Sequence, residues 1–433
     1  MFYDWAKNPP AGWNSWDCYG AGVTEQQLKE NADYMAKNLK QYGWEYIVCD
    51  IQWFDPYAKG NYYNVFPEVI LDEYGRLLPA ENRFPSSEGG KGFKPIADYI
   101  HSLGLKFGIH ILRGIPRRAV YLNLPILGSD KHASDIADAN SICPWNSSMY
   151  GLKNCDDAQL YYDSIISLYA SWDVDFIKCD DIAYVEGTML SDPYSAYYEI
   201  EMIRKAIDKT GREIILSLSP GPAQLKNYEH LSAYSNMWRM TGDFWDSWDK
   251  LHAMFAKCKE WEGKAKPGRY PDCDMLPVGV LAKNEAYEGK KNRKSNLSKE
   301  EIITMMSLWG IFKSPLIIGG NLPELDDFML SVLTNSEYMI MNFECYDSRE
   351  FERVEQDNEG YIIWTASGDK CKYAALFNTS HKKAEITLKL SSILMPGTKY
   401  KLYDIWEMET LGDFKDTFTV EIKPHAAMLL KIE

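Results

Sequence analysis

Between residue 10 and about residue 320, short runs of apolar and β-branched residues alternate with longer segments whose apolar positions recur every three or four residues. The short runs are typical of buried strands and the longer segments of amphipathic helices. Their alternation predicts a parallel sheet, because each helix returns the chain to the edge where the next strand starts. The predicted strands are Pro10 to Trp16, Tyr46 to Trp53, Lys106 to Ile111, Phe176 to Asp181, Glu213 to Ser219, Met237 to Asp243, Leu276 to Leu281 and Pro315 to Gly319.

Capping residues mark the ends of several predicted helices. Thr24 precedes Gln27 and Ser298 precedes Glu301 at the capping-box spacing, while Gly104 is placed to end a helix. Eight strands, each followed by a helix, predict a (β/α)8 TIM barrel whose site lies at the C-terminal strand ends. An open, doubly wound sheet is the alternative.

The pattern changes beyond about residue 340, where apolar and polar residues alternate with a period of two. This alternation predicts a small antiparallel β-sandwich. We therefore expect an α/β chain with a barrel domain over residues 1–338 and a C-terminal sandwich domain over residues 339–433. The predicted strands of the second domain are Tyr361 to Ala366, Tyr373 to Asn378, Ile386 to Leu390, Tyr400 to Ile405, Phe418 to Ile422 and Met428 to Ile432.

Composition and charge exclude several classes of protein. Apolar residues make up 45% of the chain, and a formal net charge of −15 opposes nucleic-acid binding. No apolar stretch approaches the roughly 18 residues of a membrane span. The nine cysteines stand singly, and the N-terminus lacks a signal-peptide pattern, so we expect free thiols and a cytoplasmic location. The composition is compatible with either a monomer or a homo-oligomer.

Acidic and aromatic residues gather where the predicted strands end. In a barrel these ends meet at one mouth, where two carboxylates roughly 5 to 5.5 Å apart can hydrolyse a glycoside while aromatic faces cover the sugar. Any single aspartate has the simpler interpretation of a helix cap, but so many converging acids favour a site. These residues are Trp16, Asp17, Asp50, Trp53, Asp180, Asp181, Asp243, Asp272 and Asp274.

Other chemistries have weaker support. The seven histidines are dispersed without the HExxH spacing of a zinc site. The chain has neither a GxxxxGK[ST] loop nor a GxGxxG motif after a strand, and the turn from Pro220 to Pro222 is unsuited to cradling phosphate. We therefore expect no metal and no organic cofactor, with a small carbohydrate as the substrate.

Three motifs resemble those of the α-galactosidases of glycoside hydrolase family 27: Ala11-Gly-Trp-Asn-Ser-Trp16, Phe176-Ile-Lys-Cys-Asp180 and Trp238-Arg-Met-Thr-Gly-Asp243. The resemblance implies a retaining exo-glycosidase that releases a terminal galacto-configured sugar by double displacement. It covers essentially the whole predicted barrel, since it extends to Gly75-Arg-Leu, Arg83-Phe-Pro, Gly92 to Ile109, Pro271-Asp-Cys-Asp-Met-Leu276 and Ser314-Pro-Leu-Ile.

The resemblance assigns roles residue by residue. Asp180 takes the position of the nucleophile and Asp243 that of the acid/base. Lys178, on the same strand face as Asp180, would bind sugar hydroxyls and keep Asp180 ionised; a plain ion pair is its simpler role. Arg239 would bind the sugar or the nucleophile. Burial against Trp245 is expected to raise the pKa of Asp243.

Neighbouring residues complete these assignments. Trp16 resembles the tryptophan that stacks on the sugar ring, and a core tryptophan is the alternative. Asp181 and Asp246 lie close to the two motif acids in the sequence, but the match places the catalytic roles on Asp180 and Asp243.

One departure from the family pattern concerns the substrate. Family α-galactosidases carry two adjacent aspartates after strand two, one for the sugar's 4-hydroxyl and one shared with the 6-hydroxyl; here Asp50 is followed by Ile51. Isoleucine leaves a buried 6-hydroxyl unpaired, at a cost of about 1 to 3 kcal/mol. β-L-Arabinopyranose has the galactose configuration without C6, so we favour β-L-arabinopyranosides, with α-D-galactosides next.

Further departures keep alternatives open. Ser219, after strand five, resembles the α-N-acetylgalactosaminidases, which makes that activity the alternative. His110 stands where the family usually has tyrosine, and Ile182 where it has a disulfide cysteine. The loop Arg113 to Arg118, whose arginines are Arg113, Arg117 and Arg118, faces either the aglycone or an acidic neighbour. A catalytically silent sugar-binding protein is the alternative outside the enzymes.

Overall fold

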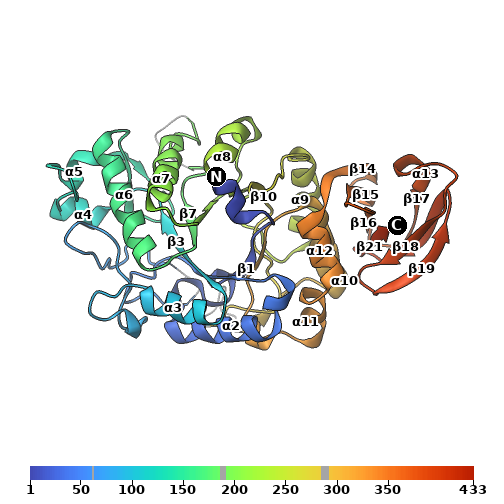
Figure 1. Cartoon of the computed structure of the whole chain (residues 1–433), viewed down its shortest axis with the longest axis horizontal. Coiled ribbons are helices and arrows are strands. Elements are labelled where there is room, and N and C mark those ends of the chain that lie inside the picture. The colour runs from blue at the N-terminus through green and yellow to red at the C-terminus, as the bar shows by residue number, and fades with distance from the viewer. Residues whose placement is uncertain (61–62, 186–191, 284–291) are drawn as a thin grey trace.

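The chain forms two units that lie side by side in a computed structural model, which describes residues 1–60, 63–185, 192–283 and 292–433. The N-terminal unit is a ring of strands surrounded by helices, and the C-terminal unit consists almost entirely of strands (Figure 1). None of the described helices has the length and apolar character needed to cross a membrane. All nine cysteines are free thiols.

Eight parallel strands form the barrel. The N–H of Leu276, beyond β10, donates to the carbonyl of Ile317 in β13 at 2.7 Å, and this contact closes the ring. The predicted (β/α)8 barrel is therefore confirmed. In spatial order the strands are β10 (Tyr270–Asp272), β9 (Met237–Arg239), β8 (Ile215–Leu218), β7 (Phe176–Asp180), β3 (Lys106–Leu112), β2 (Tyr46–Cys49), β1 (Ala11–Asn14) and β13 (Leu316–Ile318).

The prediction of the seventh strand was wrong. It placed this strand over Leu276 to Leu281, but the barrel strand is β10, six residues earlier. Within the predicted range Leu276 makes a single parallel bridge to β13, and only Val280–Leu281 form a strand, β11, which pairs with β12 (Arg293–Lys294) outside the barrel. Pro277 and the left-handed Gly279, with a φ of 76°, interrupt the apolar run.

The helices surround the barrel, and the two predicted capping boxes are confirmed. The N–H of Thr24 donates to Gln27 Oε1 at 3.0 Å, and that of Ser298 donates to Glu301 Oε2 at 2.8 Å. The main helices are α2 (Glu25–Asn38), α3 (Lys94–Ser102), α6 (Asp156–Ser171), α7 (Tyr197–Thr210), α8 (Tyr228–Tyr234), α9 (Trp248–Glu260), α10 (Lys299–Phe312), α11 (Asp327–Leu333) and α12 (Ser336–Glu344).

An insertion after β3 was not predicted. It contains two short helices, α4 (Arg117–Leu122) and α5 (Ala133–Ile136), and a three-stranded antiparallel sheet. The sheet strands are β4 (Ile115–Pro116), β6 (Met149–Leu152) and β5 (Ala137–Ile142). The insertion brings Trp145 to the wall of the cavity described below.

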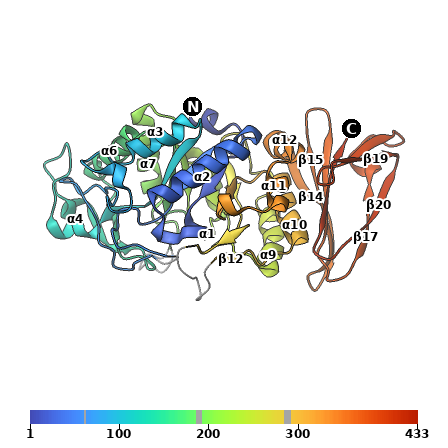
Figure 2. The same cartoon turned by 90° about the horizontal axis from the view of Figure 1, so that it is seen from below.

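The C-terminal unit is the predicted antiparallel β domain. Its six-stranded sheet has the order β14 (Tyr346–Gln356), β15 (Glu359–Ser367), β16 (Lys372–Asn378), β21 (Ala427–Ile432), β18 (Tyr400–Asp404) and β19 (Glu409–Phe414), and a second sheet pairs β17 (Ala384–Lys389) with β20 (Thr417–Ile422). Strands β14 and β19 were missed. Helices α9, α10 and α12 separate this unit from the barrel strands (Figure 2).

Candidate active site

A cavity of about 210 Å³ opens at the C-terminal ends of the barrel strands. In a barrel this is the end where side chains from several strands converge. The cavity wall includes the residues to which the family motifs and their departures gave a catalytic or sugar-binding role: Trp16, Asp50, Ile51, His110, Lys178, Asp180, Ser219, Arg239 and Asp243. Of the other strand-end residues, Trp53, Asp181 and Asp272 do not line it.

Asp180 ends β7 with its side chain largely buried. His110 Nε2 donates to Asp180 Oδ2 at 3.1 Å, and the N–H of Asp181 donates to Oδ1 at 2.8 Å. Burial alone would raise the pKa of Asp180, but the hydrogen bond and charge of His110, followed by the charge of Lys178, hold this pKa below its ordinary value. The carboxylate is therefore ionised at neutral pH.

Lys178 forms its direct ion pair with Asp50. Its Nζ lies 2.9 Å from Asp50 Oδ2, which also accepts a hydrogen bond from Asn14 Nδ2 at 2.8 Å. The N–H of Ile51 donates to the other carboxylate oxygen at 2.8 Å. Burial works against charge on Asp50, yet Lys178 and His110 lower the pKa of this carboxylate. Lys178 thus acts on Asp180 through its charge and binds Asp50.

Asp243 lies at the exposed side of the cavity. Its side chain is 66% exposed, and its Oδ1 is 3.3 Å from Arg239 NH2. The predicted burial of Asp243 against Trp245 was wrong, although both residues line the cavity. Arg239 is buried and its NH2 makes a closer ion pair, at 2.6 Å, with Asp274 Oδ2.

Asp274 is a wall residue that the sequence had marked only as a strand-end acid. It is buried in the left-handed conformation, with a φ of 84°, and accepts a hydrogen bond from the N–H of Phe244 at 2.8 Å. Burial raises the pKa of Asp274 to about 7, and Arg239 opposes the rise while Asp243 adds to it. Through the hydrogen bond from Phe244, the carboxylate of Asp274 fixes the backbone directly after Asp243. The structure also places Asp17, another strand-end acid, in this wall.

Asp274→Asn should change how stability depends on pH. The folded pKa of Asp274, about 7, lies above the unfolded value of roughly 3.9, so its contribution to stability is complete below pH ~4 and is lost as the pH rises through 7. Replacement by asparagine should make the free energy of unfolding fall less between pH 4 and 8. Urea titrations of both proteins at several pH values give the free energy of unfolding at each pH. If this free energy changed equally with pH in both proteins, the raised pKa of Asp274 would be contradicted.

Ile51 belongs to an apolar wall on the side of the cavity next to Asp50. Its side chain is 3% exposed and packs in one cluster with Ala21, Ala58, Leu112 and Met149. Of these five residues only Ile51 lines the cavity, and the other four pack around it, so an apolar side chain without a hydrogen-bonding group faces the space beside Asp50.

Three aromatic rings continue this wall toward the solvent. The rings of Trp16 and Tyr63 are stacked with centroids 5.6 Å apart, and Tyr63 lies 5.3 Å from Trp145. Tyr63 and Trp145 were missed because they lie in loops without a motif. Trp16 lines the cavity rather than the core.

Ser219 follows β8 and is buried beside the cavity. Its N–H donates to the carbonyl of Cys179 at 2.8 Å, which aligns it with the end of β7. Pro220 and Gly221 extend the same part of the wall. Ile182 is buried in the main core cluster.

Asp181 and Asp246, the two neighbouring acids to which the family motifs give no catalytic role, are held in ion pairs. Asp181 Oδ2 lies 3.0 Å from Arg113 NH2, and Arg113 NH1 lies 3.1 Å from Glu199 Oε1, all within the protein interior. Asp246 pairs with Arg293 at 2.6 Å. Arg113 therefore faces an acidic neighbour, and not the aglycone.

The remaining arginines of this loop lie elsewhere. Arg117 covers the Tyr150 ring at 4.8 Å from its centroid. Arg118 is exposed. Neither belongs to the residues that line the cavity among the described parts of the chain.

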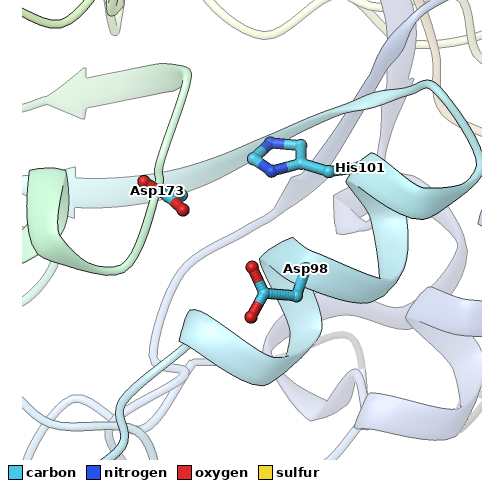
Figure 3. Close-up of side chains that lie close together, drawn as sticks. All are labelled: Asp98, His101 and Asp173. Atoms are coloured by element: carbon cyan, nitrogen blue, oxygen red, sulfur yellow. The ribbon is translucent and has the colours of Figure 1, made fainter.

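Asp98, His101 and Asp173 form a compact group of possible metal ligands, and their side chains turn toward one another (Figure 3). His101 and Asp173 precede β3 and β7, so the group lies at the end of the barrel opposite the cavity. Lys94 lies 3.2 Å from Asp173, and Arg212 lies 2.7 Å from it. These cations neutralise the carboxylates, so the donor set fits an ion-pair network better than a metal site.

Sequence profiles of two families match the chain. The one described as Alpha galactosidase A matches residues 9–344, and the one described as Alpha galactosidase C-terminal beta sandwich domain matches residues 358–432. Alpha-galactosidase 2 of Arabidopsis thaliana is 27% identical over 428 residues, which span 98% of this chain and 89% of the relative.

Two solved structures resemble the whole chain more closely. A variant of a family 27 β-L-arabinopyranosidase from Geobacillus stearothermophilus, in complex with arabinose, is 48% identical with a TM-score of 0.95 and coverage of 100% of this chain and 99% of the other. A protein of Bacillus halodurans proposed to be an α-N-acetylgalactosaminidase is 45% identical with a TM-score of 0.86, covering 98% and 97%.

Proposed function

Because this chain belongs to glycoside hydrolase family 27, the α-galactosidase family, and is therefore an O-glycosyl hydrolase, we propose that it is a retaining exo-glycosidase that prefers β-L-arabinopyranosides. The observation that carries the substrate proposal is the buried, apolar position of Ile51 directly beside the charged Asp50. Catalysis rests on Asp180 and Asp243, which line the same cavity.

In the first half of the proposed reaction, Asp180 attacks the anomeric carbon. The environment of this carboxylate keeps it ionised, as a nucleophile requires. Asp243 donates its proton to the glycosidic oxygen, the bond to that oxygen breaks, and the aglycone leaves as an alcohol. The sugar remains attached to Asp180 as an ester.

In the second half, Asp243 takes a proton from water, and the resulting hydroxide attacks the anomeric carbon. The bond to Asp180 breaks, and the carboxylate is restored. Two inversions give net retention of configuration. The exposure of Asp243 supports this role, because the acid/base must reach both the leaving oxygen and the incoming water.

Asp50, Lys178 and Trp16 are proposed to hold the sugar. Asp50 and Lys178 form a charged pair that can exchange hydrogen bonds with the 4-hydroxyl and its neighbour, while Asn14 fixes the orientation of Asp50. The indole of Trp16 offers an apolar face to the ring. Arg239, held by Asp274, orients Asp243.

The wall around Ile51 supports a sugar without C6. A hydroxymethyl group placed beside Asp50 would meet the apolar side chain of Ile51, and its hydroxyl would lose water without gaining a partner there, at a cost of about 1 to 3 kcal/mol. L-Arabinopyranose has a hydrogen atom in place of this hydroxymethyl group. The similarity to a β-L-arabinopyranosidase that binds arabinose gives independent support.

Ile51→Asp should shift the preference toward α-D-galactosides. The new carboxylate can accept a hydrogen bond from the 6-hydroxyl, so the ratio of kcat/KM for galactoside to arabinopyranoside should rise by about 10- to 100-fold. Ile51→Leu keeps an apolar side chain of equal volume and is the control, whose ratio should stay near the original. An unchanged ratio in folded Ile51→Asp would refute the exclusion of C6 by this residue.

An α-N-acetylgalactosaminidase is the second candidate function. The small side chain of Ser219 in the cavity wall leaves room near the 2-position, and the Bacillus halodurans relative carries that proposed activity. An N-acetylgalactosaminide also has a C6 hydroxymethyl group, so it would meet the same Ile51 wall. The kcat/KM values of the unaltered protein on the arabinopyranoside, the galactoside and the N-acetylgalactosaminide separate these activities.

A further inference from the structure

Arg83 joins two loops that form the wall of the cavity. Its NH2 donates to the carbonyls of Ala21 and Val23, the latter at 2.7 Å, in the loop after β1. Its NH1 donates to the carbonyls of Gln52 and Asp55, at 2.7 and 2.9 Å, in the loop after β2. One guanidinium therefore binds four backbone carbonyls, two in each loop.

The two joined loops carry Ile51 and residues that pack around it. Ala21 comes from the first loop, and Ile51 and Ala58 from the second, and all three belong to one buried cluster, of which Ile51 lines the cavity. The loops also touch through their backbones, since the N–H of Gly22 donates to the carbonyl of Gly60 at 3.3 Å. The distance between the loops thus sets how tightly Ile51 is packed.

The charge of Arg83 is not used in an ion pair with any described residue. The side chain is 6% exposed, and no carboxylate oxygen of the described residues lies within 4 Å of its guanidinium. Four carbonyl oxygens and the Phe84 ring, whose centroid lies 5.2 Å away, surround the guanidinium, and only a planar, forked donor can reach four carbonyls in two directions. Lysine, with one ammonium, cannot do so.

The backbone that Arg83 holds is in an unusual conformation. Gln52, next to Ile51, has a φ of 63°, which a residue with a side chain rarely adopts. Its side chain pairs with the backbone of Asn64, accepting from the N–H at 2.8 Å and donating to the carbonyl at 2.6 Å. Arg83 binds the carbonyl of this same residue, so it fixes the turn that aims Ile51.

The geometry points to Arg83 as a positioning residue for sugar specificity: it holds the loops after β1 and β2 together so that the Ile51 wall cannot yield to a C6 hydroxymethyl group. Arg83 does not line the cavity, and it acts through the two loops. The direction of the specificity effect rests on the proposed function of the same site.

Arg83→Lys tests the inference through the ratio of kcat/KM for p-nitrophenyl β-L-arabinopyranoside to that for the α-D-galactopyranoside. The ratio should fall roughly tenfold, mainly through a lower KM for the galactoside, because the loosened wall admits the larger sugar. Arg204→Lys is the matched control. Arg204 is equally buried, on α7, and contacts the rings of Phe2 and Trp5 near the opposite end of the barrel.

Chemical rescue separates positioning from a general loss of stability. Arg83→Ala with guanidinium at non-denaturing concentration should recover the original ratio, whereas ammonium at equal concentration should not. Gly22→Ala separates the same loops with Arg83 in place, because an added Cβ would collide with the backbone at Gly60, and it should shift the ratio in the same direction.

A ratio that stays within twofold of the original in folded Arg83→Lys or Gly22→Ala would overturn the role of Arg83. Equal shifts in Arg83→Lys and Arg204→Lys would overturn it as well. If the unaltered protein prefers the galactoside, the proposed substrate is wrong. The role of Arg83 is then still decided by whether the ratio changes in Arg83→Lys and not in Arg204→Lys.

Discussion

Asp180→Asn is expected to lower kcat/KM by about 10⁴-fold or more on every glycoside that the enzyme accepts. The variant keeps the shape of the side chain and its contact with His110 but loses the charge that attacks the anomeric carbon. Asp180→Gly should form a glycosyl azide of inverted configuration when azide is added, because azide then takes the place of the nucleophile. Kinetics and NMR of the product measure both effects.

The neighbouring acid supplies the control for this experiment. Asp181→Asn removes a partner of the buried Arg113, so it should lower the melting temperature while kcat/KM stays within about tenfold. A normal rate in Asp180→Asn would contradict the nucleophile assignment. A 10⁴-fold loss in folded Asp181→Asn with a normal rate in Asp180→Asn would move the role to Asp181.

Asp243→Asn should produce the second largest loss, and its size should depend on the leaving group. Aglycones that leave poorly need the proton from Asp243, so their rates should fall about 10²- to 10⁴-fold, while an activated nitrophenolate should be released at a rate much closer to normal. With azide, Asp243→Gly should give a glycosyl azide of retained configuration, because the azide attacks the sugar on Asp180.

Asp246→Asn is the matched control for Asp243. Asp246 is buried in an ion pair with Arg293 and also accepts a hydrogen bond from the N–H of Asn296 at 2.6 Å, so its replacement should affect stability without any dependence on the leaving group. If Asp243→Asn lowered the rates of all leaving groups equally, its role as the proton donor would be refuted.

The barrel was predictable because its strands are short, apolar and separated by helices with clear caps. The strand predictions were wrong where the composition of a strand is untypical of strands. In β10, Pro271 lies in the middle of the strand, and the run at Leu276 to Leu281 is more apolar, so the sequence pattern favours that run. Strand β14 is rich in charged residues and mostly exposed, so its period-two pattern is weak. The antiparallel insertion after β3 has no comparable signal.

The candidate site was predictable to the extent that its residues sit at strand ends. Asp50 and Asp180 could be predicted at the cavity because they end predicted strands, whereas the roles of Lys178 and Arg239 came from the resemblance to the family motifs. Tyr63 and Trp145 come from loops whose paths depend on tertiary contacts, so no pattern in the sequence marks them. The exposure of Asp243 likewise has no signal in the sequence.

The proposed preference of this enzyme for a sugar with galactose configuration and no C6 can be measured as kcat/KM of the unaltered protein on p-nitrophenyl β-L-arabinopyranoside, α-D-galactopyranoside and N-acetyl-α-D-galactosaminide under identical conditions. We predict that the arabinopyranoside is best by about tenfold or more, since its ring meets the Ile51 wall without a hydroxymethyl group. A higher value for the galactoside or the N-acetylgalactosaminide would contradict the claim.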